Sequence, residues 1–175
     1  MEELQLVERA RSGDDRAFAM LVHMHEKSMY ATAYAVTRSG WDAADAVQEA
    51  FAEAYDKIGT LRDALRFKAW LTRILINKCN QGLRRRKREV VTGTLPEPDA
   101  FTYVGPERGI DLMAAIQGLD EEFRDVIALR YFRDMKIDEI ASLLDCPAGT
   151  VKSRMNRALG KLRTALRVGH TEVAE

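Results

Sequence analysis

Prolines and glycines gather in one short segment, and this segment most restricts how the chain can fold. Three of the four prolines and three of the eleven glycines lie between Glu89 and Gly109. Proline removes a backbone donor and glycine weakens a helix, so the segment favours turns over a regular element. We therefore predict a flexible linker over residues 89–109, between domains of residues 1–88 and 110–168, with a tail over residues 169–175.

The stretches on both sides of this segment have helical patterns. Neither shows the period-2 alternation of β-branched residues that strands require. Helix breaks and caps fall at residues 12–15 and 39–42. The patterns predict helices over about residues 15–37, 42–58, 67–88, 110–117, 120–131, 137–144 and 148–167. The expected fold is all-α, with two small helical domains joined by a linker.

Composition narrows the class of protein. The chain is 46% hydrophobic and 31% charged, and charges interrupt every apolar run before the ~20 residues that span a bilayer. Its first residues are acidic, unlike a signal peptide. Cys79 and Cys146 are too few and too far apart for a disulfide framework or a zinc knuckle. We expect a cytoplasmic protein that does not insert into a membrane.

A net charge of zero hides a strong segregation of charge. Residues 146–171 contain six basic side chains and no acidic one, and residues 84–88 are all basic. Local fields, more than net charge, steer a polyanion onto a protein surface. These two runs favour a nucleic-acid partner, although solvated helix faces would give the same pattern.

The predicted helix over residues 42–58 has an acidic side. Its apolar sector contains Ala44, Val47, Phe51, Ala54, Tyr55 and Ile58. The opposite side carries Asp42, Asp45, Glu49, Glu53 and Asp56. Like charges one turn apart are mutually unfavourable, and no lysine interleaves them. A basic protein partner would offset this cost; the alternative is an ordinary exposed acidic face.

The predicted helix that begins at Phe67 is basic. Phe67, Trp70 and Leu71 begin its core stripe, and the basic run of residues 84–88 ends it. Basic side chains with nearby aromatic ones suit a surface that tracks phosphates and receives unstacked bases. We expect Trp70, at core spacing, to pack in the interior instead of stacking on a base.

The C-terminal stretch has the pattern of a helix-turn-helix. Residues 137–144 form a short amphipathic helix, residues 145–147 a turn, and the next helix carries a polar and basic side. Arginine can bind guanine edges, and Ser and Thr can bind bases or phosphates. The amides at Gly149–Thr150, at the helix start, can bind a phosphate. A helical hairpin that does not bind DNA is the alternative.

These three segments, in this order, resemble the extracytoplasmic-function sigma factors of bacterial RNA polymerase. Residues 42–51 (DAADAVQEAF) resemble region 2.2 of that family. Residues 67–77 (FKAWLTRILIN) with the following arginines resemble regions 2.3 and 2.4, and residues 119–124, 139–141 and 149–154 resemble region 4. The sequence departs from the family pattern at Ala46, Gln81 and Asp120, and Gln81 bears most on the surface that binds the −10 element.

The resemblance implies partners and residue roles. Core polymerase, through its β′ clamp helices and β subunit, would bind Asp42, Asp45, Gln48, Glu49 and Glu53. The −10 promoter element would be bound and opened by Arg62, Lys68, Arg73, Asn77, Lys78, Arg84 and Arg85. The −35 element would be read by Thr150, Lys152, Ser153, Arg154, Arg157 and Lys161. The linker would thread through polymerase, and a separate anti-sigma factor is a further expected partner.

Two other classes of function fit the sequence less well. A stand-alone helix-turn-helix regulator would explain the C-terminal half but would leave the acidic helix and the basic run of residues 84–88 without a role. An enzyme is not expected, because the sequence has no metalloprotease, phosphate-loop or nucleophile-elbow motif. His23 and His25 point apart on a helix, so we expect no metal, and no cofactor is indicated.

Overall fold

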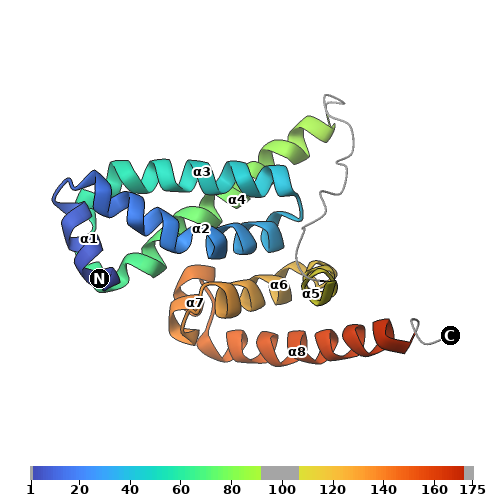
Figure 1. The fold of residues 1–175 in the computed structure, drawn as a ribbon. Helices are drawn as coiled ribbons and strands as arrows, with labels where there is room; N and C mark the ends of the chain where they lie inside the picture. Colours follow the sequence, from blue (N-terminus) through green and yellow to red (C-terminus); the bar gives the residue numbers. More distant parts are fainter. Residues whose placement is uncertain (1, 92–106, 172–175) are drawn as a thin grey trace. The chain divides into compact units, whose positions relative to one another are not determined.

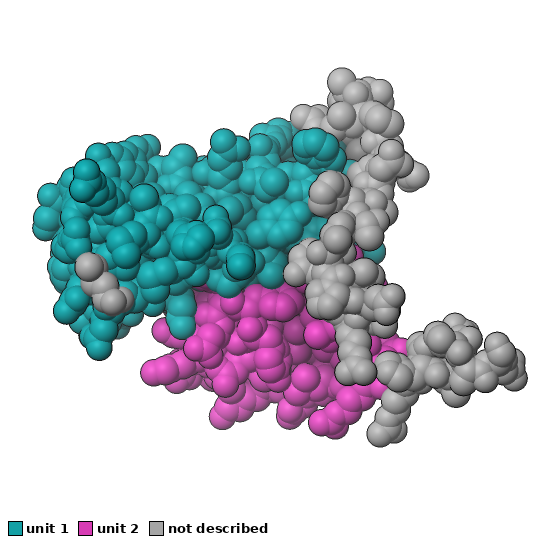
Figure 2. All heavy atoms as spheres, viewed as in Figure 1, with its two compact units in different colours: residues 1–99 teal, residues 100–175 magenta. Residues whose placement is uncertain are grey.

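A computed structural model describes residues 2–91 and 107–171 of the chain, and it is helical on both sides of the gap (Figure 1). The chain divides into two compact units, residues 1–99 and residues 100–175 (Figure 2). The all-α prediction is confirmed, and the described residues contain no strand. None of the described helices is both long and apolar enough to cross a membrane.

The first unit is built from four helices and two short turns. These are α1 (Glu3–Arg11), α2 (Asp15–Thr37), α3 (Gly40–Lys57), the 3-10 turns η1 (Ile58–Thr60) and η2 (Ala64–Arg66), and α4 (Phe67–Val91). Asp14 begins α2 by accepting a hydrogen bond from the Ala17 amide at 3.1 Å. Ser39 begins α3 in the same way, accepting from the Asp42 amide at 3.2 Å. Helix α3 packs against both α2 and α4 (Figure 1).

A row of alanines sets the orientation of α3. Ala43, Ala46, Ala50 and Ala54 are buried, and their small side chains let the neighbouring helices approach closely. The predicted apolar sector is therefore wrong in part, because Ala44 is exposed and Tyr55 is 49% exposed. Close packing between helices buries the alanine face of α3. The sequence pattern gives most weight to large apolar side chains, so it predicted a different face.

In the second unit, three shorter helices pack against one side of the longest helix. The elements of this unit are α5 (Glu107–Gln117), α6 (Glu121–Ile127), the π-helical turn η3 (Ala128–Phe132), α7 (Ile137–Leu144) and α8 (Ala148–Thr171). Helix α8 contacts α5, α6 and α7. Val151, Ala158 and Leu162 lie on its buried side, and Ile140 of α7 is fully buried. One side of α8 is thus committed to the core, which leaves the other for a partner.

Three helices extend beyond their predicted ends. Helix α4 continues to Val91 and α5 begins at Glu107, so both extend into the predicted linker of residues 89–109, and α8 ends at Thr171, within the predicted tail. The sequence has no helix breaker between Arg88 and Gly93, which lets α4 continue. The rest of the predicted linker and tail, residues 92–106 and 172–175, lies outside the described residues.

Candidate functional site

The acidic side of α3 has an exposed part and a part that is turned toward α4. The side chains of Asp45 and Glu49 are 58% and 45% exposed, and Gln48 beside them is exposed as well. Asp42 and Glu53 are turned toward α4 and are only 25% and 29% exposed. Of the five residues expected to bind polymerase, three therefore form an outer edge, and two lie at the boundary with α4.

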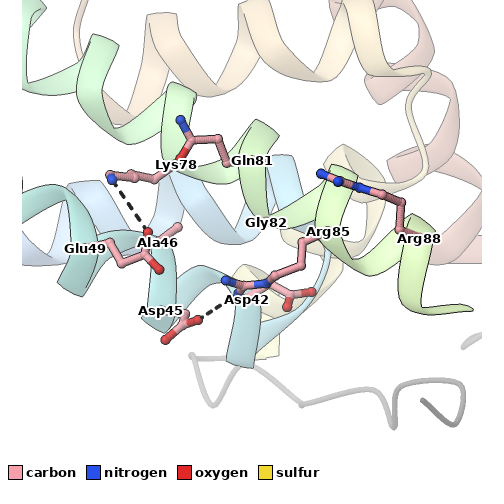
Figure 3. Close-up of a pocket in the computed structure, with 9 residues that line it drawn as sticks. All are labelled: Asp42, Asp45, Ala46, Glu49, Lys78, Gln81, Gly82, Arg85 and Arg88. Atoms are coloured by element: carbon pink, nitrogen blue, oxygen red, sulfur yellow. Dashed lines mark hydrogen bonds and ion pairs between the residues drawn. The ribbon is translucent and has the colours of Figure 1, made fainter. Parts of the chain in front are cut away.

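Cations of α4 already neutralise much of this acidic side (Figure 3). Lys78 Nζ lies 2.9 Å from Glu53 and 3.7 Å from Glu49, and Arg85 lies 3.2 Å from Asp45. Arg86 forms an ion pair with Asp42. The like-charge cost inferred from the sequence is thus offset within the chain, so that cost is no longer an argument for an external basic partner.

Glu53 is the most constrained of these carboxylates. Lys57 Nζ lies 2.7 Å from it, in addition to Lys78 at 2.9 Å. Hydrogen bonds from Lys57 and then Lys78 hold the pKa of Glu53 below its ordinary value, and the bond to Glu53 raises the pKa of Lys78. Both groups are therefore charged at neutral pH, and the pair fixes α3 against α4.

Helix α4 divides the predicted −10 residues between two sides. Arg73, Asn77 and Arg84 are exposed on α4 and do not line the pocket that it forms with α3, and Arg62 is exposed in the turn before the helix. Lys68 is half-buried. Lys78 and Arg85 lie instead against α3, in the ion pairs described above. Trp70 is half-buried, with its ring 6.0 Å from that of Phe67, which agrees with its predicted packing role.

The turn before α4 presents an apolar side chain that the sequence analysis did not single out. Asp63 caps η2 by accepting a hydrogen bond from the Leu65 amide at 3.0 Å. This turn leaves the Leu65 side chain 79% exposed. Leu65 lies in a turn, where helical periodicity gives no signal, so only its position between Arg62 and Lys68 could have indicated it.

The helix-turn-helix is present as predicted. Helix α7 spans Ile137–Leu144, as the pattern indicated, and α8 begins at Ala148. Asp145 ends α7 in the left-handed conformation at φ 51°. The Cys146 amide donates to the Ala141 carbonyl at 3.1 Å, which closes the turn. This turn aims the two helices so that α8 presents its polar side outward.

The predicted −35 residues of α8 fall into two groups. Lys152, Ser153 and Arg157 are exposed on the outward side, with Thr150 half-buried at its start. Arg154 and Lys161 lie at the flank next to α6. Arg154 pairs with Glu122 at 2.9 Å, and Lys161 pairs with Asp120 at 2.9 Å. Lys161 also lies 5.2 Å above the Phe123 ring.

Asn156 is an outward residue of α8 that the sequence analysis missed. It is exposed, and it lies three residues after Ser153 and next to Arg157. An asparagine amide presents both a donor and an acceptor, which suits an adenine edge in the major groove. The sequence could have identified Asn156, because Ser153, Asn156 and Gly160 follow the helical repeat of the outward side.

Comparisons with known proteins agree with this arrangement. The Sigma-70 region 2 family matches residues 21–89, and Sigma-70, region 4 matches residues 115–164. The first match accounts for the half of the chain that a stand-alone helix-turn-helix regulator leaves unexplained.

Relatives and solved structures cover nearly the whole chain. The RNA polymerase sigma-H factor of Pseudomonas aeruginosa is 33% identical over 94% of each chain, and the ECF RNA polymerase sigma factor SigW of Bacillus subtilis is 31% identical over 92% of this chain and 95% of its own. The sigma factor RpoE of Bartonella quintana, solved with the anti-sigma factor NepR, has a TM-score of 0.74 at 28% identity, covering 86% of this chain and 97% of its own. CnrH, solved with the cytosolic domain of CnrY, has a TM-score of 0.69 at 28% identity, covering 95% and 97%. The chain therefore belongs to the sigma-70 family, as an extracytoplasmic-function sigma factor that directs bacterial RNA polymerase to promoters.

Proposed function

We propose that this sigma factor divides promoter recognition among three surfaces. The outer edge of α3, with Asp45, Gln48 and Glu49, docks on the β′ clamp helices of core polymerase. The 61–68 turn and the exposed side of α4 bind and open the −10 element, and the outward side of α8 reads the −35 element. The observation that carries this proposal is that each unit has an exposed basic or polar helix face opposite its core, at Arg73, Asn77 and Arg84 of α4 and at Lys152, Ser153 and Arg157 of α8.

The residues predicted from the sequence differ in how accessible they are for these roles. Arg62, Arg73, Asn77 and Arg84 are exposed and can meet DNA directly, whereas Lys68 is half-buried. Asp42 and Glu53 support the docking edge from behind, through their contacts with α4. We assign Arg154 and Lys161 to positioning α8 against α6, with phosphate contacts secondary. Promoter opening by flipped bases draws on the exposed Leu65 as well as on the cations of α4.

In vitro transcription on genomic DNA fragments tests this function. Sigma-free bacterial core polymerase is assayed with and without the protein. Start sites that appear only in its presence, each preceded by a shared two-part motif, are the expected result. If no start site appears on DNA that contains its own promoters, and the protein alone shifts a duplex, the promoter-directing proposal is wrong and a stand-alone regulator replaces it.

Arg157→Ala should weaken binding of the −35 element by about 1–3 kcal/mol and relax the preference at one base position. Arg157 is exposed on the outward side of α8, where its guanidinium can reach a base edge. Lys161→Ala is the matched control: its ammonium is held by Asp120, so it should lower affinity evenly across sequences. Competition between promoter variants measures both effects, and an even loss for Arg157→Ala would reassign that residue to phosphate binding.

An anti-sigma factor is a further proposed partner. The similar Bartonella quintana sigma factor was solved bound to an anti-sigma factor, and this chain shares its fold over 86% of its length. The protein would then act in the cytoplasm, with no catalysis of its own, and be released by a signal. Pull-down from the native cell tests the partner, and recovery of polymerase without any inhibitory protein would count against it.

A further inference from the structure

The polymerase-docking and DNA-binding surfaces of the first unit share their charges. Arg85 and Lys78 belong to the set proposed to bind the −10 element, yet Arg85 lies 3.2 Å from Asp45 and Lys78 lies 3.7 Å from Glu49. Asp45 and Glu49 in turn belong to the docking edge. In the free protein, each surface therefore supplies counter-ions to the other.

These ion pairs border a pocket that is open to solvent (Figure 3). The pocket has a volume of about 430 Å³ and lies between Asp42, Asp45 and Glu49 of α3 and Lys78, Arg85 and Arg88 of α4. Ala46 and Gly82 line it as well and fill little of it, and an added Cβ at Gly82 would meet nothing within 4 Å. A cationic side chain from outside can thus reach the carboxylates while Arg85 swings away.

We propose that docking of polymerase exchanges these ion pairs. A basic side chain of the polymerase replaces Arg85 on Asp45, and the released Arg85 then meets promoter phosphates, while Lys78 stays paired with Glu53 at 2.9 Å. Exposed ion pairs contribute little stability each, so the exchange is reversible. The coupling is reciprocal. DNA bound to Arg85 releases Asp45 and thereby raises the affinity for polymerase by the same factor by which polymerase raises the affinity for DNA. This inference rests on the proposed function of both surfaces.

Arg85→Gln should have opposite effects on the two partners. Loss of the competing guanidinium should raise affinity for sigma-free core polymerase roughly two- to fivefold, the range for an exposed ion pair. Affinity for a single-stranded dT oligonucleotide should fall. Arg84→Gln is the matched control, because it removes the same charge from the adjacent, exposed residue, which does not line the pocket between α3 and α4. It should lower DNA affinity without raising polymerase affinity.

Asp45→Asn tests the exchange from the other side. The free protein should bind the dT oligonucleotide more tightly than wild type, while its polymerase affinity falls. Both assays are run at low ionic strength, where exposed pairs are least screened, and circular dichroism confirms that each variant is folded. If Arg85→Gln and Arg84→Gln bind polymerase equally, the exchange is refuted while docking stands. If the wild-type protein binds no core polymerase, the proposed function itself fails.

Discussion

Glu49→Lys is expected to lose roughly tenfold or more of its affinity for core polymerase, as charge reversal at a complementary interface does. The Glu49 side chain is 45% exposed on the outer edge of α3, so the new ammonium would meet a basic partner directly. The fold should persist, because Lys78 keeps its 2.9 Å contact with Glu53. Titration of fluorescently labelled protein with sigma-free core measures the affinity.

Glu26→Lys is the matched control for this reversal. Its side chain is 46% exposed on α2, so the change in charge and the exposure are alike, but it lies outside the acidic side of α3. It should keep wild-type affinity for core polymerase. Similar losses in both variants would show a general charge effect and would remove the docking assignment from α3.

The helices whose ends were predicted best are those with a clear capping residue or turn at the end. Asp14 caps α2, and the turn at Asp145 ends α7, so the predicted bounds of both helices agree with the structure. Where no such signal is present, the predicted end of a helix differs from the observed one. The expected helix over residues 120–131 ends as α6 at Ile127 and continues as the π-helical turn η3, a change of hydrogen-bond pattern that no residue there signals.

The charged residues of the site were predictable, but their pairings were not. Arg85 and Asp45 are 40 residues apart in sequence, and Arg86 and Asp42 are 44 apart. Helical periodicity relates residues only within one helix, so it gave the acidic side of α3 without the cations of α4 that neutralise it. For the same reason it could not show that Glu122 of α6 lies 2.9 Å from the guanidinium of Arg154, a residue predicted to bind the −35 element.

The second unit contains a carboxyl group that its fold does not accommodate well. Asp125 of α6 has a buried Oδ1 with no hydrogen-bond partner among the described residues. Burial raises the pKa of Asp125 to about 6, although the positive charge of Arg124 opposes this shift. At neutral pH the carboxylate is therefore ionised in a place that disfavours charge, and its presence costs the second unit stability.

Asp125→Asn should stabilise the second unit by on the order of 2–3 kcal/mol at pH 7.5 and by nothing measurable below about pH 4. Between the ordinary aspartate pKa and about 6, the folded wild type holds a proton that the unfolded chain has lost, so wild-type stability falls as pH rises through this window and stays lower above it. The neutral amide removes that dependence. Hydrogen exchange of α6 and α8 amides, compared with wild type at each pH, measures the free energy of unfolding of the second unit.

Asp145→Asn supplies the control within the same unit. Asp145 is exposed and left-handed at φ 51°, a conformation that asparagine tolerates, so the protection of this variant should stay within about 0.5 kcal/mol of wild type. If Asp125→Asn gains protection equally at pH 4 and pH 7.5, its benefit comes from hydrogen bonding by the new amide. The buried-charge account of Asp125 would then be wrong, because only an ionising group makes the gain depend on pH.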